Sequence, residues 1–294
     1  MHNGMEQRPV GLIGLGLLGK AIAGRLLSAG MTVTGCDVAQ RARDEAQALG
    51  VTVVEDHHAV AATCGVIVLS LPTSEIRQAL LWGGGGLAKS LPEGALLLDT
   101  TTGRPEDTEV DWARLNALQI DFVDVCVLAS SALVARGEAV LLVGDAESRA
   151  GGYAPLLRTF GRQIFYLGKA GDGSRMKLMA NQVLGLNRLV LAEALGLAER
   201  CGLDLEMTLD VLKSGPASSQ VMFTKGARMI AGDFTPEARL AQHAKDVGLI
   251  LEMGERCGAK LPLSALHREV LNQLIDSGHG GEDNSAVVRA FKQE

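Results

Sequence analysis

The sequence predicts an α/β domain followed by an all-α domain, the two joined by one long helix. Three observations support this prediction. Short β-rich runs alternate with helical stretches up to residue 167, the strand pattern ends after Gly168, and one helical pattern then covers residues 174–200. Alternating strands and helices indicate βαβ units and a largely parallel sheet. We therefore expect one domain over residues 8–169 and a second over residues 170–294.

The expected strands are short runs rich in Val, Ile and Leu. They cover residues 10–13, 32–36, 66–71, 95–99, 121–127, 139–144 and 163–168. Helices are expected between them at residues 17–29, 40–49 and 105–118, and in the second half at residues 205–213, 238–257 and 263–277. The stretch 174–200 is apolar on most sides, and a helix of that kind is expected to be buried.

Composition excludes several classes of protein. The net charge of −6 argues against a nucleic-acid-binding surface, which would be basic. The five cysteines are widely spread and form no CxxC, so neither a disulfide framework nor a metal site is expected. The polar N-terminus lacks the apolar region of a secretory signal, and no apolar run is long enough to span a membrane. We therefore expect a cytoplasmic protein.

The stretch "VGLIGLGLLGKAIAGRLLSAG" begins as a strand and ends as a helix. Gly14, Gly16 and Gly19 place the pattern G-x-G-x-x-G at the junction between the two. In this pattern the first glycine allows a tight turn, the second lets the backbone approach a pyrophosphate, and the third lets helix and strand pack closely. The helix N-terminus offers unpaired N–H groups to phosphates. These features predict a Rossmann-type dinucleotide-binding domain whose phosphate loop comprises Gly14, Leu15, Gly16, Leu17, Leu18 and Gly19.

An acidic residue stands where such a domain recognises ribose. Asp37 ends the second expected strand, 21 residues after Gly16. Its carboxylate can accept hydrogen bonds from the ribose hydroxyls of NAD and would repel the 2′-phosphate of NADP. Arg41 and Arg43 lie just downstream, and either of them can bind a 2′-phosphate. The sequence therefore favours NAD and leaves NADP open.

Six motifs in order resemble the β-hydroxyacid dehydrogenase family, which includes 3-hydroxyisobutyrate dehydrogenase and tartronate semialdehyde reductase. The resemblance covers Val10 to Phe291. The motifs are "GLIGLGLLG", "DTTTGRP" from Asp99 to Pro105, a loop from Asp124 to Gly137, the set Gly171, Gly173, Lys177 and Asn181, the pair Lys245-Asp246, and "DNSA" from Asp283. The resemblance implies a second domain like the C-terminal domain of 6-phosphogluconate dehydrogenase, and a homodimer or homotetramer.

The resemblance also implies roles for individual residues. Lys177 would transfer a proton to or from a substrate oxygen, because partial burial brings the pKa of a lysine nearer neutrality. Asn181, one helical turn later, would hold the substrate hydroxyl or the lysine. The resemblance further implies cofactor contacts from Leu71, Pro72, Thr102 and Lys245, and substrate contacts from Thr102, Leu128, Ala129, Ser130, Lys177 and Asn181.

The substrate loop departs from the family pattern. Leu128, Ala129 and Ser130 stand where the family has Ser-Gly-Gly, whose hydroxyl and backbone N–H groups hold the substrate carboxylate. Ser130 and Ser131 offer hydroxyls as replacements, whereas Leu128 makes the pocket less polar. The motif therefore supports the fold and the cofactor better than it supports any one substrate.

Together these features predict an NAD(P)-dependent oxidoreductase that interconverts a short 3-hydroxy acid and its semialdehyde or keto form. Two alternatives stay open: a relative of the imine reductases, and a dinucleotide-binding protein that has lost catalysis. Two further expectations concern the second half of the chain. We expect His243 to be an exposed helix residue and Glu282-Asp283 to lie in a solvated turn.

Overall fold

The computed structural model describes residues 9–292 of the chain. The chain divides into two compact units, Met1–Lys177 and Leu178–Glu294. We call them the sheet unit and the helical unit. The domain boundary at residues 169 and 170 stays a prediction, because helix α8 (Asp172–Arg200) begins in one unit and continues into the other.

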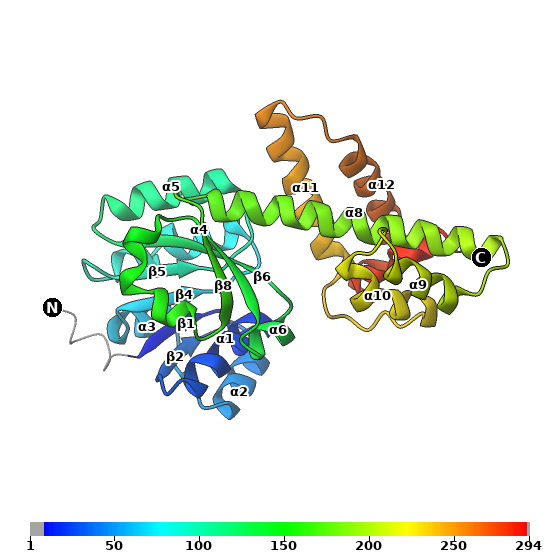
Figure 1. The fold of residues 1–294 in the computed structure, drawn as a ribbon. Coiled ribbons are helices and arrows are strands. Elements are labelled where there is room, and N and C mark those ends of the chain that lie inside the picture. The colour runs from blue at the N-terminus through cyan, green and yellow to red at the C-terminus, as the bar shows by residue number, and fades with distance from the viewer. Residues whose placement is uncertain (1–8, 293–294) are drawn as a thin grey trace. The chain divides into compact units, whose positions relative to one another are not determined.

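The sheet unit is built on one eight-stranded sheet, whose strands are labelled in Figure 1. The strand order is β3-β2-β1-β4-β5-β6-β7-β8, and every neighbouring pair is parallel except β6 and β7. This arrangement confirms the predicted Rossmann-type fold. The strands are β1 (Val10–Ile13), β2 (Val33–Cys36), β3 (Thr52–Val53), β4 (Val66–Leu69), β5 (Leu96–Asp99), β6 (Asp121–Leu128), β7 (Ala139–Val143) and β8 (Gly161–Tyr166).

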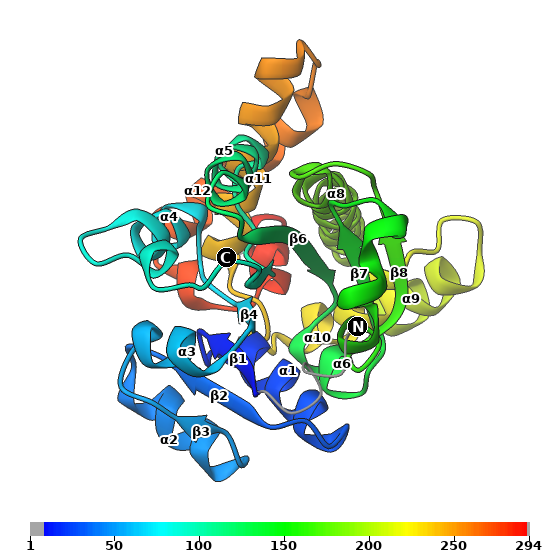
Figure 2. The ribbon, with the colours of Figure 1, turned by 90° about the vertical axis from the view of Figure 1, so that its left-hand side faces the viewer.

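Alternation of side chains explains why these short apolar runs form a sheet that is covered on both faces. Leu12 packs in one apolar cluster and its neighbour Ile13 in another, as expected when successive strand residues point to opposite faces. Helices cover the faces, and Figure 2 shows β1 lying between β2 and β4. The helices of this unit are α1 (Leu17–Ser28), α2 (Gln40–Ala48), α3 (His57–Thr63), α4 (Ser74–Trp82), α5 (Pro105–Asn116), α6 (Ser131–Ala135) and α7 (Ala154–Leu157), with short 3-10 turns η1 (Leu87–Lys89) and η2 (Glu147–Gly152).

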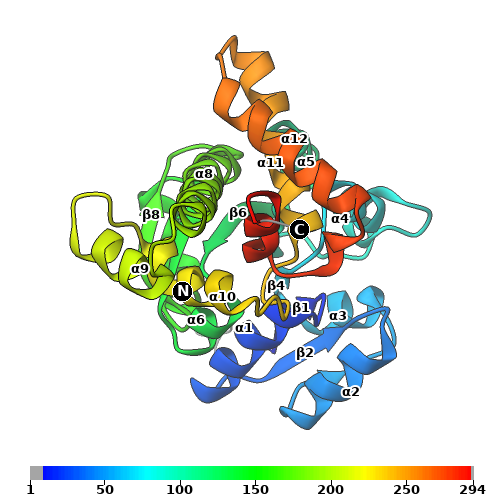
Figure 3. The same cartoon turned by 90° about the vertical axis from the view of Figure 1, so that its right-hand side faces the viewer.

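The helical unit packs around an aliphatic core to which Leu191, Leu195 and Val247 belong. Helices α11 and α12 lie side by side in Figure 3 and are joined by a short loop. The elements after α8 are α9 (Leu205–Ser214), α10 (Gln220–Ala231), α11 (Leu240–Cys257), α12 (Pro262–Asp276), and the 3-10 helices η3 (His279–Gly281) and η4 (Asn284–Ala290). Strand β3 and helices α4, α6, α7 and α10 were not among the elements expected from the sequence. Among the described residues, no helix combines the length and apolarity that a membrane span requires.

The expectation that the long helix is buried was wrong for one of its sides. Val183, Val190 and Leu197 are 58%, 61% and 64% exposed. They are spaced seven residues apart and therefore form one stripe along α8. Apolarity on most sides of a helix predicts that its surface will be covered, but it does not say that the same chain covers it. We refer to these three residues as the α8 stripe.

The two expectations of solvent exposure in the helical unit were also wrong. His243 is 8% exposed, and its ring lies 5.1 Å from that of His267, measured between centroids. Burial, with the nearby charge of Arg188, holds the pKa of His243 well below its ordinary value. Asp283 is fully buried and binds the Lys225 ammonium at 3.0 Å. Helical periodicity places a residue on a face but does not reveal a buried charged partner from another element.

Candidate active site

The candidate cofactor residues follow the carboxyl ends of adjacent parallel strands. In the sheet register, Ile13 of β1 pairs with Cys36 of β2 and with Leu69 of β4, and Leu69 pairs with Asp99 of β5. The residues that follow these strand ends therefore lie along one edge of the sheet. They include the candidates Gly14, Asp37, Leu71, Pro72 and Thr102. Ligands of open α/β sheets bind at this edge, where the strand order reverses, which here is at β1.

The three glycines of the phosphate loop are required for different reasons. Gly14 has φ of +96°, and a Cβ there would lie 2.2 Å from the Ser70 carbonyl oxygen. A Cβ on Gly19 would lie 2.0 Å from the Gly14 carbonyl oxygen. A Cβ on Gly16, in contrast, would meet no atom within 4 Å. The packing of the protein therefore demands the first and third glycines, whereas the space beside Gly16 fits the approach of a pyrophosphate.

The N-terminus of α1 is suited to the same group. Leu15 is buried, whereas Leu17, the first residue of α1, is 66% exposed. No described side chain makes a capping hydrogen bond to this end of the helix. Its backbone N–H groups and the positive end of the helix dipole thus remain available to an anion. These residues fit the phosphates of a dinucleotide.

Asp37 is tied to the phosphate loop. Its Oδ2 accepts a hydrogen bond of 2.7 Å from the Leu15 N–H, and its Oδ1 accepts one of 2.8 Å from the Ala39 N–H. A carboxylate has further lone pairs, so ribose hydroxyls can still donate to it. Arg43 Nη1 donates to the Asp37 carbonyl oxygen at 3.0 Å, whereas the Arg41 side chain is 91% exposed. Groups suited to NAD and to NADP therefore lie at the same strand end.

Two loops at this edge are joined through Thr101. The Thr101 hydroxyl accepts a hydrogen bond of 3.4 Å from the Leu71 N–H, and its own N–H donates to Asp99 Oδ1 at 3.1 Å. Thr101 is 1% exposed, whereas Thr102 is partly exposed. Thr101 thus holds the loops after β4 and β5 together. Of the two threonines, Thr102 is the one that remains accessible to a ligand.

A buried charged network lies beneath these loops. Arg77 of α4 is fully buried and donates to Asp99 at 2.6 Å and to Asp111 of α5 at 2.8 Å. Trp82 Nε1 donates to the second oxygen of Asp111 at 2.7 Å. Burial opposes the charge of Arg77, but the two carboxylates outweigh it and raise its pKa. Sequence reasoning missed this network, since Arg77 and Asp111 are 34 residues apart in different helices.

Strand β6 positions the start of α8 through Asp124. The buried Asp124 carboxylate accepts hydrogen bonds of 3.0 Å from the N–H groups of both Gly171 and Ser174. Glycines at 144 and 173 leave room for it, because a Cβ on either would lie within 2.7 Å of its oxygens. Burial raises the pKa of Asp124 to about 6, although the two N–H groups act in the opposite direction. The sequence analysis assigned Asp124 only to the start of the substrate loop, and an acidic residue inside an apolar strand is the signal that could have indicated this role.

Lys177 is held by the same strand, one turn later on α8. Its Nζ donates a hydrogen bond of 2.8 Å to the carbonyl oxygen of Val127, and the side chain is partly buried. Strand β6 therefore fixes the first turns of α8 at two points: at the helix N-terminus through Asp124, and at the lysine through Val127. The structure thus places the Lys177 amine beside the end of a strand that adjoins the dinucleotide edge.

The candidate substrate loop begins where β6 ends. Leu128 and Ala129 are partly buried, and Ser130 is exposed. The Ser130 hydroxyl oxygen accepts a hydrogen bond of 3.4 Å from the Leu133 N–H and so caps α6. Its O–H can still donate to a ligand. Leu128 directly follows the residue whose carbonyl binds Lys177.

In the helical unit, Asp246 joins two of the candidate residues. Asn181 Nδ2 donates to Asp246 Oδ2 at 3.0 Å, and Lys245 Nζ lies 3.3 Å from Asp246 Oδ1. The sequence motif showed Lys245 and Asp246 as neighbours but did not reveal the bond to Asn181. Among the described residues, no group of three or more His, Cys, Asp or Glu is arranged to hold a metal ion.

A Rossmann-type sheet, a glycine loop open at Gly16 after β1 and a lysine bound at the end of β6 in the same sheet are typical of NAD(P)-dependent oxidoreductases. A family model of the NAD-binding domain of 6-phosphogluconate dehydrogenase matches residues 9–168. A second model, described as NAD-binding of NADP-dependent 3-hydroxyisobutyrate dehydrogenase, matches residues 171–291. The chain belongs to the β-hydroxyacid dehydrogenase family and is an NAD(P)-dependent oxidoreductase.

Individual relatives agree with this assignment. The chain is 32% identical to 2-(hydroxymethyl)glutarate dehydrogenase of Eubacterium barkeri, covering 97% of this chain and 95% of that one. The structure of 3-hydroxyisobutyrate dehydrogenase of Mycobacterium tuberculosis with L-serine has a TM-score of 0.87 and 26% identity, covering 97% and 99% of the two chains. An imine reductase of Myxococcus stipitatus is more distant, with a TM-score of 0.61 and 19% identity over 97% and 100% of the chains, and shows the fold alone.

Proposed function

We propose that the protein interconverts a short 3-hydroxy acid and the matching semialdehyde or keto acid, with Lys177 as general acid and base. The observation that carries the proposal is the hydrogen bond of 2.8 Å from Lys177 Nζ to the Val127 carbonyl oxygen. A backbone acceptor holds the amine in one place at the end of β6. A proton-transferring group needs this kind of fixed position within reach of the reacting oxygen.

In the direction of oxidation, the substrate O–H bond breaks and its proton passes to the Lys177 amine as the carbonyl forms. NAD(P), held at the carboxyl edge of the sheet by the glycine loop and Asp37, would supply the hydride chemistry, accepting a hydride in oxidation and giving one in reduction. In reduction, the Lys177 ammonium gives a proton to the carbonyl oxygen. Asn181 binds the substrate hydroxyl, and Asp246 orients the amide of Asn181, since it accepts from Nδ2. Lys245, which lies beside Asp246, is proposed to contact the cofactor.

The substrate loop supports an acid with an apolar portion. Leu128 and Ala129 offer apolar surface at the end of β6, and Ser130 offers a hydroxyl donor. The curated relative from Eubacterium barkeri is named for a substituted dicarboxylate, which is a larger acid than 3-hydroxyisobutyrate. We therefore propose that branched or substituted 3-hydroxy acids bind better than the smallest members of the class.

The test compares wild type with Lys177→Ala and Lys177→Arg on a panel of 3-hydroxy acids, following reduced cofactor by absorbance. We expect both variants to lose at least about 100-fold in kcat, the size of a general acid–base contribution, while cofactor binding is retained. Near-wild-type turnover in Lys177→Ala would contradict the proton-transfer role. Turnover of cyclic imines but of no hydroxy acid would favour the imine reductase alternative. Cofactor binding without turnover on either panel would favour a protein that has lost catalysis.

We further propose a cytoplasmic homodimer or homotetramer that prefers NAD. The α8 stripe supports self-association, because a row of large apolar side chains is stabilised when a partner covers it. Asp37 supports the preference for NAD. Size-exclusion chromatography with light scattering measures the oligomeric state. We expect Val190→Glu to shift the protein toward monomer, and a monomeric wild type would contradict the proposal.

A further inference from the structure

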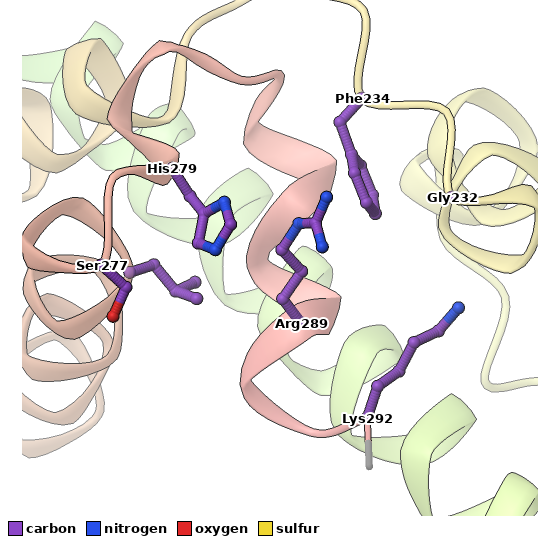
Figure 4. Close-up of a pocket in the computed structure, with 7 residues that line it drawn as sticks. Gly232, Phe234, Ser277, His279, Arg289 and Lys292 are labelled. Atoms are coloured by element: carbon purple, nitrogen blue, oxygen red, sulfur yellow. The ribbon is translucent and has the colours of Figure 1, made fainter. Parts of the chain in front are cut away.

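A cavity of about 550 Å³ opens in the helical unit. None of the residues assigned to the reaction above lines it. Its volume falls within the range of small-molecule sites, roughly 300–1,000 Å³. Figure 4 shows it bounded by the end of α10, the end of α12 and the 3-10 helices near the C-terminus. The side chains that matter for recognition are Phe234, Leu274, His279, Arg289 and Lys292.

The charged and titratable lining is entirely basic. His279, Arg289 and Lys292 line the cavity, and no lining residue carries a carboxylate. Arg289 lies in the last turn of η4 and Lys292 lies two residues beyond its end, and Figure 4 shows both side chains at the cavity. Two cations that line the same cavity attract an anion.

One acidic residue outside the lining fixes this basic wall. Glu282 accepts from Arg289 Nε at 2.9 Å and from Arg289 Nη2 at 3.2 Å, and it lies 3.2 Å from His279 Nδ1. These bonds orient the guanidinium and leave its Nη1 available. Within residues 9–292, neither Arg289 Nη1 nor the Lys292 ammonium has a carboxylate or carbonyl partner. The site thus holds an oriented guanidinium and, beside it, a lysine ammonium, both able to donate to a ligand.

The remaining wall is apolar and partly aromatic. The Arg289 guanidinium carbon lies 4.5 Å from the centre of the Phe234 ring, and Figure 4 shows the guanidinium between Phe234 and His279. Such stacking holds an arginine side chain in place without using its hydrogen-bond donors. Leu274 is buried at the cavity. A ligand there meets a cationic end and an apolar surface together.

We propose that this cavity binds a small organic anion. Its carboxylate or phosphate lies between Arg289 and Lys292, and its planar or apolar body lies against Phe234 and Leu274. The proposal does not depend on the proposed reaction, because it uses none of the residues that carry it.

The experiment titrates the full-length protein with 4-fluorobenzoate and with 4-fluorophenyl phosphate, and follows the ligand by fluorine NMR. The neutral probe 4-fluorobenzyl alcohol has a similar body without the charge. We expect saturable binding of at least one anion and at least tenfold weaker binding of the alcohol. The tighter anion identifies the charged group that the site prefers.

Variants locate the binding. Lys292→Gln should weaken anion binding at least tenfold and leave kcat/KM of the dehydrogenase reaction unchanged. Lys260→Gln, an exposed lysine between α11 and α12, is the matched control and should leave anion binding unchanged. Arg289→Gln should have an effect at least as large, but it also releases Glu282, so the conclusion rests on Lys292. Absence of saturation, equal binding of the alcohol, or binding that is insensitive to Lys292→Gln would each overturn the proposal.

Discussion

Substitution of Gly16 by alanine should separate cofactor binding from folding. A Cβ at Gly16 would occupy open space, whereas a Cβ at Gly19 would lie 2.0 Å from a backbone oxygen. Gly16 is also the N-cap of α1, where replacing glycine by alanine costs less than about 1 kcal/mol. We therefore expect the unfolding free energy of Gly16→Ala without cofactor to lie within about 1 kcal/mol of the wild-type value.

The destabilising effect of the added methyl group should appear only when the cofactor is present. A methyl group forced into a packed contact costs about 1–3 kcal/mol, which corresponds to an increase in the cofactor Kd of about 5- to 150-fold. The assay combines a fluorescence titration of reduced cofactor with thermal unfolding. At a cofactor concentration of about 100 times Kd, binding adds about 2.7 kcal/mol to the unfolding free energy of wild type. At the same concentration, a 5- to 150-fold weaker Kd should remove about 0.9–2.4 kcal/mol of that gain from Gly16→Ala.

Two other glycines of α1 serve as controls. Gly24 lies in the middle of the helix with no neighbour within 4 Å of a Cβ, so Gly24→Ala should stabilise the fold by about 0.5–1 kcal/mol and leave cofactor binding unchanged. Gly19→Ala should lower both stability and binding. The reasoning would be refuted if Gly16→Ala bound cofactor as wild type does, or if it destabilised the free enzyme as much as Gly19→Ala.

Three further perturbations test other parts of the chain. Asp37→Ala should lower the ratio of kcat/KM with NAD to that with NADP, and an unchanged ratio would exclude Asp37 as the ribose contact. Arg77→Met leaves the carboxylates of Asp99 and Asp111 buried without their cation, so chemical denaturation should show a loss of about 3–5 kcal/mol; a loss below 1 kcal/mol would contradict this account. Burial lowers the pKa of His267 from 6.5 to about 4, so the unfolded chain binds a proton first as the pH falls. The unfolding free energy should therefore decrease by up to about 3 kcal/mol between pH 6.5 and 4, and His267→Gln should reduce this dependence.

The sheet unit was predictable because its signals are local. The apolar run from Val10 to Ile13, the glycines that follow it and the acid at Asp37 each report on a few neighbouring residues, and the structure places them as expected. Parallel strands then bring their ends to one edge without further information. The catalytic and binding roles of the candidate residues themselves stay predictions.

Other features depend on contacts between distant segments and were not predictable. Asp283 occupies a stretch rich in glycine and acidic residues that suggested a solvated turn, but Lys225 of α10 reaches it in the interior. His243 has the periodicity of a surface position, yet it packs against His267 of α12. Arg77 and Asp111 pair across two helices. In each case, the partner that decides the environment is far away in sequence.

The division of the chain falls directly after Lys177. Strand β6 therefore holds the Lys177 amine through Val127 and the start of its helix through Asp124. Both contacts lie in the unit that carries the glycine loop. Substitutions in the following helices leave this anchor intact, because both of its hydrogen bonds are made within the sheet unit. The group proposed to transfer the proton can therefore stay in place while other parts of the chain change.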